Sequence, residues 1–142
     1  MTEDEWRGFV SHGTRTGKLA VTRVSGEPHV TPVWFLLDET SAALQVVFTV
    51  WGDSVKARAL RRTRRFSLCV DDQEPPYSYV QLRGTAELSD DATALRSWAR
   101  RLGSRYMGPE NAEAYQQRNA VPGEFLVRAT VEHVIARSGI AD

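Results

Sequence analysis

Alternation of apolar and polar residues, the period of a β-strand, recurs along much of the chain. Segments with this period are rich in Val, Leu, Phe or Tyr and are bounded by Gly, Pro, Ser or Asp. We expect six strands, over residues 17–24, 29–38, 43–50, 65–72, 77–88 and 124–136. The turn sequence SGEP (25–28) joins the first two and predicts a hairpin.

Two residues inside these strands interrupt the pattern. Pro32 cannot donate a hydrogen bond to a neighbouring strand, so it predicts a sheet edge, a bulge, or a place where something other than a strand lies alongside. Gly84 lies within the fifth strand and predicts a bulge or a tight bend there.

Apolar residues spaced three and four apart predict helices between the strands. We expect helices over residues 2–12, 53–62, 89–108 and 109–120. Thr2 and Glu5 form a capping-box pattern at the first of these, and either Ser89 or Asp90 is expected to cap the long third helix, which ends at Gly108.

Six strands joined mainly by hairpins and short helices predict a mainly β fold. The architecture expected is a six-stranded, mostly antiparallel barrel with short peripheral helices at its ends. With 142 residues, the chain is long enough for one well-filled core, so we expect a single domain over residues 1–142.

Composition narrows the class of protein. The 18 Lys and Arg residues balance 18 Asp and Glu residues, which argues against a general nucleic-acid binder. The acidic first residues do not form a signal peptide, and no apolar run approaches the roughly 18 residues of a membrane span. The single cysteine cannot form an internal disulfide, so we expect a cytoplasmic protein without a membrane partner.

The cations are concentrated in one connection between two strands. Six of the ten residues from Lys56 to Arg65 are Lys or Arg. They fit a solvated helix face, whose last cations complement the helix dipole, or a contact with nucleic acid phosphates. A third interpretation is an anion cup at the start of the helix, built from free backbone N–H groups, the Ser54 hydroxyl, Lys56 and Arg58.

An ordered series of segments resembles a known family. The series runs GKLAVTRVSGEPHVTPVWF (17–35), VVFTVWGDSVKARALRR (46–62), FSLCVDD (66–72) and PPYSYVQLRGTAEL (75–88). It is similar to the pyridoxamine 5'-phosphate oxidase-like split-barrel proteins, which bind FMN or the deazaflavin coenzyme F-420. The resemblance implies an FMN-binding type of split β-barrel and a homodimer with two cofactor sites at the subunit interface.

The resemblance also implies a set of cofactor-binding residues. The positions that line the ring system match Thr31, Pro32, Val33 and Trp34. The positions that hold the ring edge and the phosphate match Thr49, Ser54, Val55, Lys56 and Arg58. The position that reaches in from the second subunit matches Tyr79, with Tyr77 near it.

The resemblance implies oxidoreductase activity in which the cofactor supplies the chemistry. The sequence PVWF…KARALRR is more similar to the deazaflavin-binding branch of the family. Flavin-binding relatives often carry a cation at the position of Val55. We therefore expect an F-420-dependent reductase of a planar unsaturated acceptor, with FMN as the second choice of cofactor. The end of the chain, VEHVIARSGIAD (131–142), lacks the Trp-and-Arg motif of true pyridoxamine phosphate oxidases. A non-catalytic protein that binds the coenzyme, haem or a tetrapyrrole remains the alternative from another class.

Other chemistry-bearing residues favour structural roles. Cys69 lies in an apolar strand, where a buried inert thiol is expected. The three histidines show no ligand spacing, so no metal site and no catalytic side chain are predicted. Asp71 and Asp72 are expected in a solvated turn.

The aromatic residues divide between a groove and the core. Trp34 alternates with Val33 and Phe35 and is expected to face away from them, toward the cofactor groove. Trp51 is expected in an exposed loop near the anion cup, and Trp98 between the long helix and the barrel.

Overall fold

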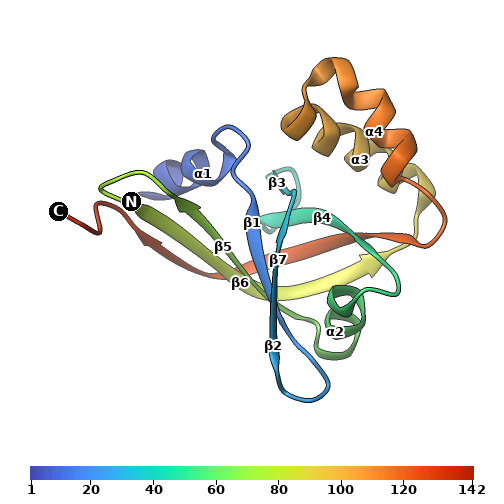
Figure 1. Cartoon of the computed structure of the whole chain (residues 1–142), viewed down its shortest axis with the longest axis horizontal. Helices are drawn as coiled ribbons and strands as arrows, with labels where there is room; N and C mark the ends of the chain where they lie inside the picture. Colours follow the sequence, from blue (N-terminus) through green and yellow to red (C-terminus); the bar gives the residue numbers. More distant parts are fainter.

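A computed structural model describes residues 1–142, and in it one antiparallel sheet runs through the whole molecule (Figure 1). Its strands are β1 (Gly17–Thr22), β2 (Pro28–Val33), β3 (Leu36–Asp38), β4 (Gln45–Trp51), β5 (Arg65–Asp72), β6 (Ser78–Ser89) and β7 (Glu124–Arg137). The helices are α1 (Glu3–Ser11), α2 (Val55–Thr63), α3 (Ala92–Met107) and α4 (Ala112–Asn119), with a 3₁₀ turn at Pro109–Asn111. None of the helices combines the length and apolar character that a membrane crossing needs.

The sheet curls on itself because its two outer strands are neighbours in the chain. The strand order is β2-β1-β5-β6-β7-β4-β3, and only Trp34 and Phe35 separate β2 from β3. Three residue steps span at most about 11 Å, so the two edges must approach each other at this joint. The expected mainly β fold, an antiparallel barrel with short helices around it, is confirmed.

The number of strands differs from the prediction, seven instead of six. The segment 29–38, expected as one strand, forms β2 and β3 with a bend between them. At the bend the Phe35 N–H donates to the Tyr106 hydroxyl at 3.2 Å instead of to a strand. A contact with a distant helix therefore ends β2, although the apolar alternation continues through it.

Both irregularities expected within the strands occur. Pro32 lies on β2, an outer strand of the sheet. At Gly84 the register between β6 and β7 shifts, which marks a bulge. A Cβ atom at Gly84 would lie 2.0 Å from the Thr130 carbonyl oxygen, so the two backbones approach there as only glycine allows.

The core lies on both faces of β4. Val46, Phe48 and Val50 belong to the main cluster inside the barrel, which α2 closes with Leu60. The other face of the sheet carries a smaller cluster that joins β4 and β7 to α3. Its members are Val47, Leu95, Trp98 and Leu126. The packing role expected for Trp98 is confirmed.

The caps of the helices match the prediction in two cases out of three. The Thr2 hydroxyl accepts from the Glu5 N–H at 3.2 Å while the Glu5 carboxylate accepts from the Thr2 N–H at 2.7 Å. Gly108 ends α3 with φ of 95°. The N-cap of α3, however, is Asp91 instead of Ser89 or Asp90, because β6 continues to Ser89 and delays the start of the helix.

Candidate functional site

A pocket of about 200 Å³ lies beside the joint between β2 and β3. Five of the residues predicted to bind a cofactor line it: Pro32, Val33, Trp34, Thr49 and Lys56. They come from β2 and the bend after it, from β4 and from the first turn of α2. Sequence reasoning missed four further residues of the wall, from α3, α4 and β7: Ala99, Leu102, Asn119 and Glu124.

Trp34 forms one wall of this pocket from the bend. Val33 and Phe35 are buried in the barrel core, so Trp34 faces away from both, as expected. Its ring stacks on Tyr106 of α3, with centroids 5.1 Å apart and an angle of 5° between the planes. Tyr115 of α4 packs against the same ring at 5.6 Å. The two helices thus fix the position of the indole at the pocket.

The bend itself is held by α3. Arg105 donates to the Phe35 carbonyl at 2.6 Å and to the Val10 carbonyl at 2.8 Å, so one guanidinium ties α1 to the bend. Burial lowers the pKa of Arg105, but its backbone acceptors satisfy the charged group. The Tyr106 hydroxyl donates to the Arg15 carbonyl at 2.8 Å and accepts from the Phe35 N–H.

Lys56 and Glu124 are the two charged residues of the pocket wall. None of the ion pairs within the chain involves Lys56, so its ammonium is available to a ligand. Burial raises the pKa of the Glu124 carboxyl, while the Thr49 hydroxyl and the Lys56 charge act in the opposite direction. A lysine and a carboxyl of raised pKa in one hollow are typical of a binding or catalytic site.

The anion cup predicted at the start of α2 is only partly assembled. Ser54 is the N-cap, and its hydroxyl accepts from the Ala57 N–H at 3.0 Å. Arg58 turns back and donates to the Asp53 carbonyl at 2.7 Å. It lines a separate hollow of about 140 Å³ with Val55, so these two residues lie outside the pocket of Lys56.

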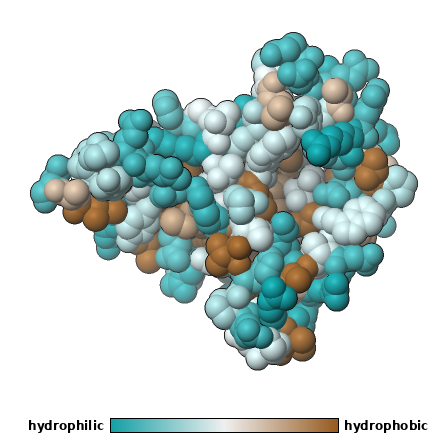
Figure 2. Space-filling view, viewed as in Figure 1, coloured by the Kyte–Doolittle hydropathy of each residue, from teal (hydrophilic) through white to brown (hydrophobic).

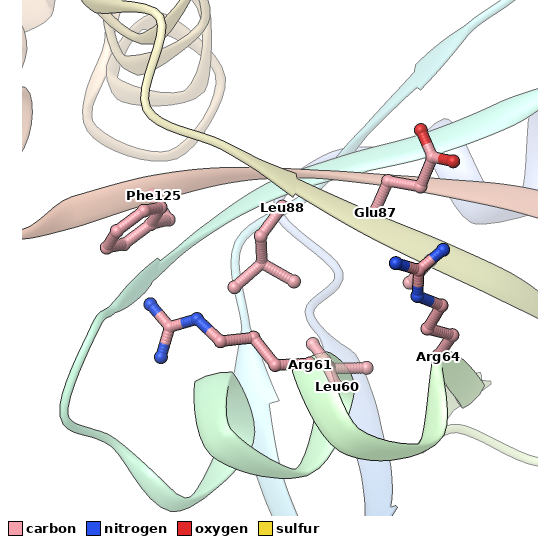
Figure 3. A pocket seen from close by; sticks show the side chains of 7 residues that line it. Leu60, Arg61, Arg64, Glu87, Leu88 and Phe125 are labelled. Carbon is pink, nitrogen blue, oxygen red and sulfur yellow. The ribbon is translucent and has the colours of Figure 1, made fainter.

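Two of the later arginines of the basic segment, Arg61 and Arg64, line a third hollow, of about 370 Å³. Figure 3 shows Arg61 and Arg64 reaching toward it from α2 and its end, opposite Leu88 and Glu87 of β6. The Arg61 guanidinium lies over the Phe125 ring at 4.6 Å and donates to the Gly52 carbonyl. Arg61 therefore holds the loop before α2 in addition to lying at the surface.

Tyr77 and Tyr79 lie outside the pocket of the same chain. Tyr79 pairs with Arg137 near the end of β7, whereas Glu124 starts that strand. Thirteen residue steps along a strand correspond to roughly 40 Å. Tyr77 is exposed in the turn before β6, close in the chain to the strand end that Figure 1 shows beside the termini.

Two buried polar atoms of β2 have no partner within the chain. The Thr31 hydroxyl oxygen and His29 Nδ1 are both shielded from solvent and make no hydrogen bond. Thr31 and Val33 share one face of β2, and Val33 lines the pocket. A buried polar atom without a partner costs about 1–3 kcal/mol, so Thr31, two residues from Val33, fits a bound group that supplies one.

The other candidate residues have structural surroundings. Burial raises the pKa of the Cys69 thiol, in line with the inert thiol expected. Asp71 and Asp72 close β5, which has the bounds expected for the fourth strand, 65–72. They do not lie in a solvated turn, because they pair with Lys18 at 2.8 Å and Arg15 at 3.2 Å. No three His, Cys, Asp or Glu side chains gather as metal ligands.

The outer surface is otherwise mixed. In the view of Figure 2 the apolar surface is broken into small patches among polar residues. Trp51 is half-exposed, as expected, but it is the last residue of β4 and does not lie in a loop. Its ring covers Gly123, where a Cβ atom would lie 2.6 Å from the indole.

Comparison with known proteins agrees with the fold. The chain belongs to the pyridoxamine 5'-phosphate oxidase family, whose sequence pattern it matches over residues 2–138. Among curated proteins, no sequence relative was found.

Three solved structures illustrate the range of this fold. A conserved hypothetical protein from Mycobacterium tuberculosis is 27% identical, with a TM-score of 0.81 over 96% of this chain and 84% of that one. An F-420 reductase is 21% identical, with a TM-score of 0.68 over 90% and 94%. The heme storage protein HutZ from Vibrio cholerae is 17% identical, with a TM-score of 0.73 over 99% and 98%. The last two likenesses concern the fold alone.

Proposed function

We propose that this protein binds coenzyme F-420 at the pocket beside Trp34 and Lys56 and acts as a reductase. The observation that carries the proposal is the convergence of five predicted residues on one pocket. They come from three separate parts of the chain, and the same pocket holds an unpaired lysine and a stacked tryptophan. A planar ring with an anionic side chain has the chemistry that such a wall recognises.

The chain's own residues would divide the work of binding. The Lys56 ammonium pairs with the acidic group of the coenzyme, an interaction of about 1.5–3 kcal/mol for a charge-assisted hydrogen bond. Trp34, held by Tyr106, offers an aromatic face, and the unpaired Thr31 hydroxyl offers a hydrogen bond to a polar ring edge. When bound and reduced, the coenzyme supplies a hydride to an electron-poor double bond of a planar acceptor.

A second copy of the chain completes the proposed site. Pockets that enclose a cofactor usually measure roughly 300–1,000 Å³, and this one measures about 200 Å³. Tyr77 and Tyr79 lie too far away to contribute within one chain. In a homodimer of the kind the sequence resemblance implies, they would cover the coenzyme from the other subunit.

FMN is the second candidate coenzyme, because it also joins a planar ring to a phosphate. F-420 is the first candidate because of the sequence around Trp34 and Lys56 and because Val55 supplies no charge. The F-420 reductase among the structural relatives makes that coenzyme the first to test.

The test is a titration of the full chain with coenzyme F-420 and, separately, with FMN, followed by tryptophan quenching. We expect Lys56→Ala to raise the Kd at least several-fold, because one charge-assisted contact is lost. Arg65→Ala is the matched control: it removes a cation of the same segment whose side chain is 74% exposed and lies outside the pocket. Equal affinity of Lys56→Ala and wild type would overturn the site, and binding of neither coenzyme would overturn the function.

Tight binding of FMN alone would move the protein to the flavin branch. Binding of haem with neither coenzyme would favour the non-catalytic alternative. Reduction of a screen of planar acceptors by the protein with reduced F-420 would then separate a reductase from a carrier.

A further inference from the structure

Glu124 is an acidic residue in the pocket proposed to hold an anion. It is the first residue of β7, opposite Trp51 of β4, and it is half-buried. The pocket wall carries one cation, Lys56, and one carboxyl, Glu124, with no other charged side chain. An ionised carboxylate here would compete with a ligand anion for the same ammonium.

The groups around Glu124 can be assigned element by element. The Thr49 hydroxyl faces it from β4, Lys56 from α2, and the uncharged Asn119 side chain from α4. Glu124 also lines a second hollow, of about 400 Å³, which contains Arg96 in α3 and Asp90 before it, two charges of opposite sign. Lys56 is therefore the cation that acts on Glu124 within the pocket.

We propose that Glu124 determines the charge that the pocket accepts, so that an anionic ligand binds beside Lys56 together with one proton on Glu124. This inference rests on the proposed function, because the ligand is the acidic group of the coenzyme. With the carboxyl protonated, the Lys56 charge is unopposed and attracts the anion. With the carboxyl ionised, it neutralises Lys56 and repels the anion.

The direction of the pH dependence follows from these charges. Burial already raises the pKa of Glu124 in the free protein, and an anion bound nearby raises it further, because it disfavours a second negative charge. Affinity is then highest below the pKa of the free protein. It falls as the pH rises toward the pKa of the complex, and proton uptake is largest between the two values.

Isothermal titration calorimetry measures this proton directly. The full chain is titrated with coenzyme F-420, or with FMN, in buffers of equal pH and different ionisation enthalpy, from pH 5 to pH 9. We expect wild type to take up a proton that Glu124→Gln does not, at a pH between the two pKa values. The difference between the two proteins cancels the titration of the ligand itself.

Affinity gives a second readout. At the alkaline end, Glu124→Gln is expected to bind about tenfold more tightly than wild type if the ligand raises the pKa of Glu124 by one unit. As the pH falls below the pKa of Glu124 in the free protein, the affinities of the two proteins converge. A variant that had merely damaged the pocket would bind more weakly at every pH.

The outcomes separate the two proposals. Binding of neither coenzyme overturns the proposed function and this inference with it. Binding with equal proton uptake and equal pH dependence in wild type and Glu124→Gln overturns the inference alone.

Should Glu124→Gln fail to fold, the carboxyl carbon of Glu124 is followed by NMR in wild type and Lys56→Ala. The pKa of Glu124 must then rise when Lys56 is removed, and an unchanged pKa overturns the coupling.

Discussion

Removal of one oxygen atom from Tyr106 tests how the wall of the pocket is held in place. In Tyr106→Phe the Phe35 N–H loses its acceptor at 3.2 Å, and the Arg15 carbonyl loses the nearer of its two donors, at 2.8 Å. The ring that stacks on Trp34 at 5.1 Å is retained. The substitution thus separates hydrogen bonding at the bend from aromatic packing at the pocket.

The expected cost follows from the number of hydrogen bonds lost. Each contributes about 0.5–1.5 kcal/mol net, so two predict a loss of about 1–3 kcal/mol in the free energy of unfolding. We expect the upper part of this range, because the Phe35 N–H lies at a bend between two strands and bonds to Tyr106 instead of to a strand. Urea unfolding, followed by tryptophan fluorescence and by circular dichroism, measures the change.

A second tyrosine provides the control. Tyr115 also packs against Trp34, at 5.6 Å, but no hydrogen bond of its hydroxyl occurs in the structure. We expect Tyr115→Phe to change stability by less than about 0.5 kcal/mol. Equal stability of Tyr106→Phe and Tyr115→Phe would refute the role of the Tyr106 hydroxyl in ending β2.

Two further changes test the fold away from the pocket. Hydrogen bonds from Thr40, together with Arg128, lower the pKa of the buried Asp38 carboxyl, so Asp38→Asn is expected to cost about 1–3 kcal/mol at pH 7. The folded state favours the ionised carboxylate, so its contribution to stability is lost as the pH falls below about 4. The free energies of unfolding of Asp38→Asn and wild type should therefore approach each other in acid, and a constant difference would contradict this assignment. Gly84→Ala is expected to cost at least about 2 kcal/mol in urea unfolding, because its Cβ atom would lie 2.0 Å from the Thr130 carbonyl oxygen. An unchanged midpoint would mean that the bulge shifts freely.

The features that could be predicted from the sequence are those that a local rule determines. Pro32 indicated a sheet edge because it lacks an N–H group, and Gly84 indicated a bulge because a side chain there is excluded. The bend after Val33 could not be predicted, since the apolar alternation runs on through Trp34 and Phe35. It depends on Tyr106, which is 71 residues away along the chain.

The same distinction applies to the site. Lys56 could be identified because a lysine in the first turn of a helix after a strand has a recognisable spacing. Arg58 fits that spacing equally well, but its side chain bonds to the Asp53 carbonyl instead. Glu124 carries no signal of its own, because a glutamate that starts a strand after Pro-Gly resembles a solvated turn residue. Its role depends on the burial that α2, α4 and β4 together produce.

The outer position of β2 also bears on how this protein behaves at high concentration. An unpaired strand edge is a template on which another chain can add, and repeated addition leads to fibrils and precipitates. Two of the six residues of β2, Pro28 and Pro32, have no amide hydrogen to offer an incoming strand. The opposite edge, β3, is only three residues long. The joint that shapes the pocket therefore also leaves the sheet with two edges that resist self-association into aggregates.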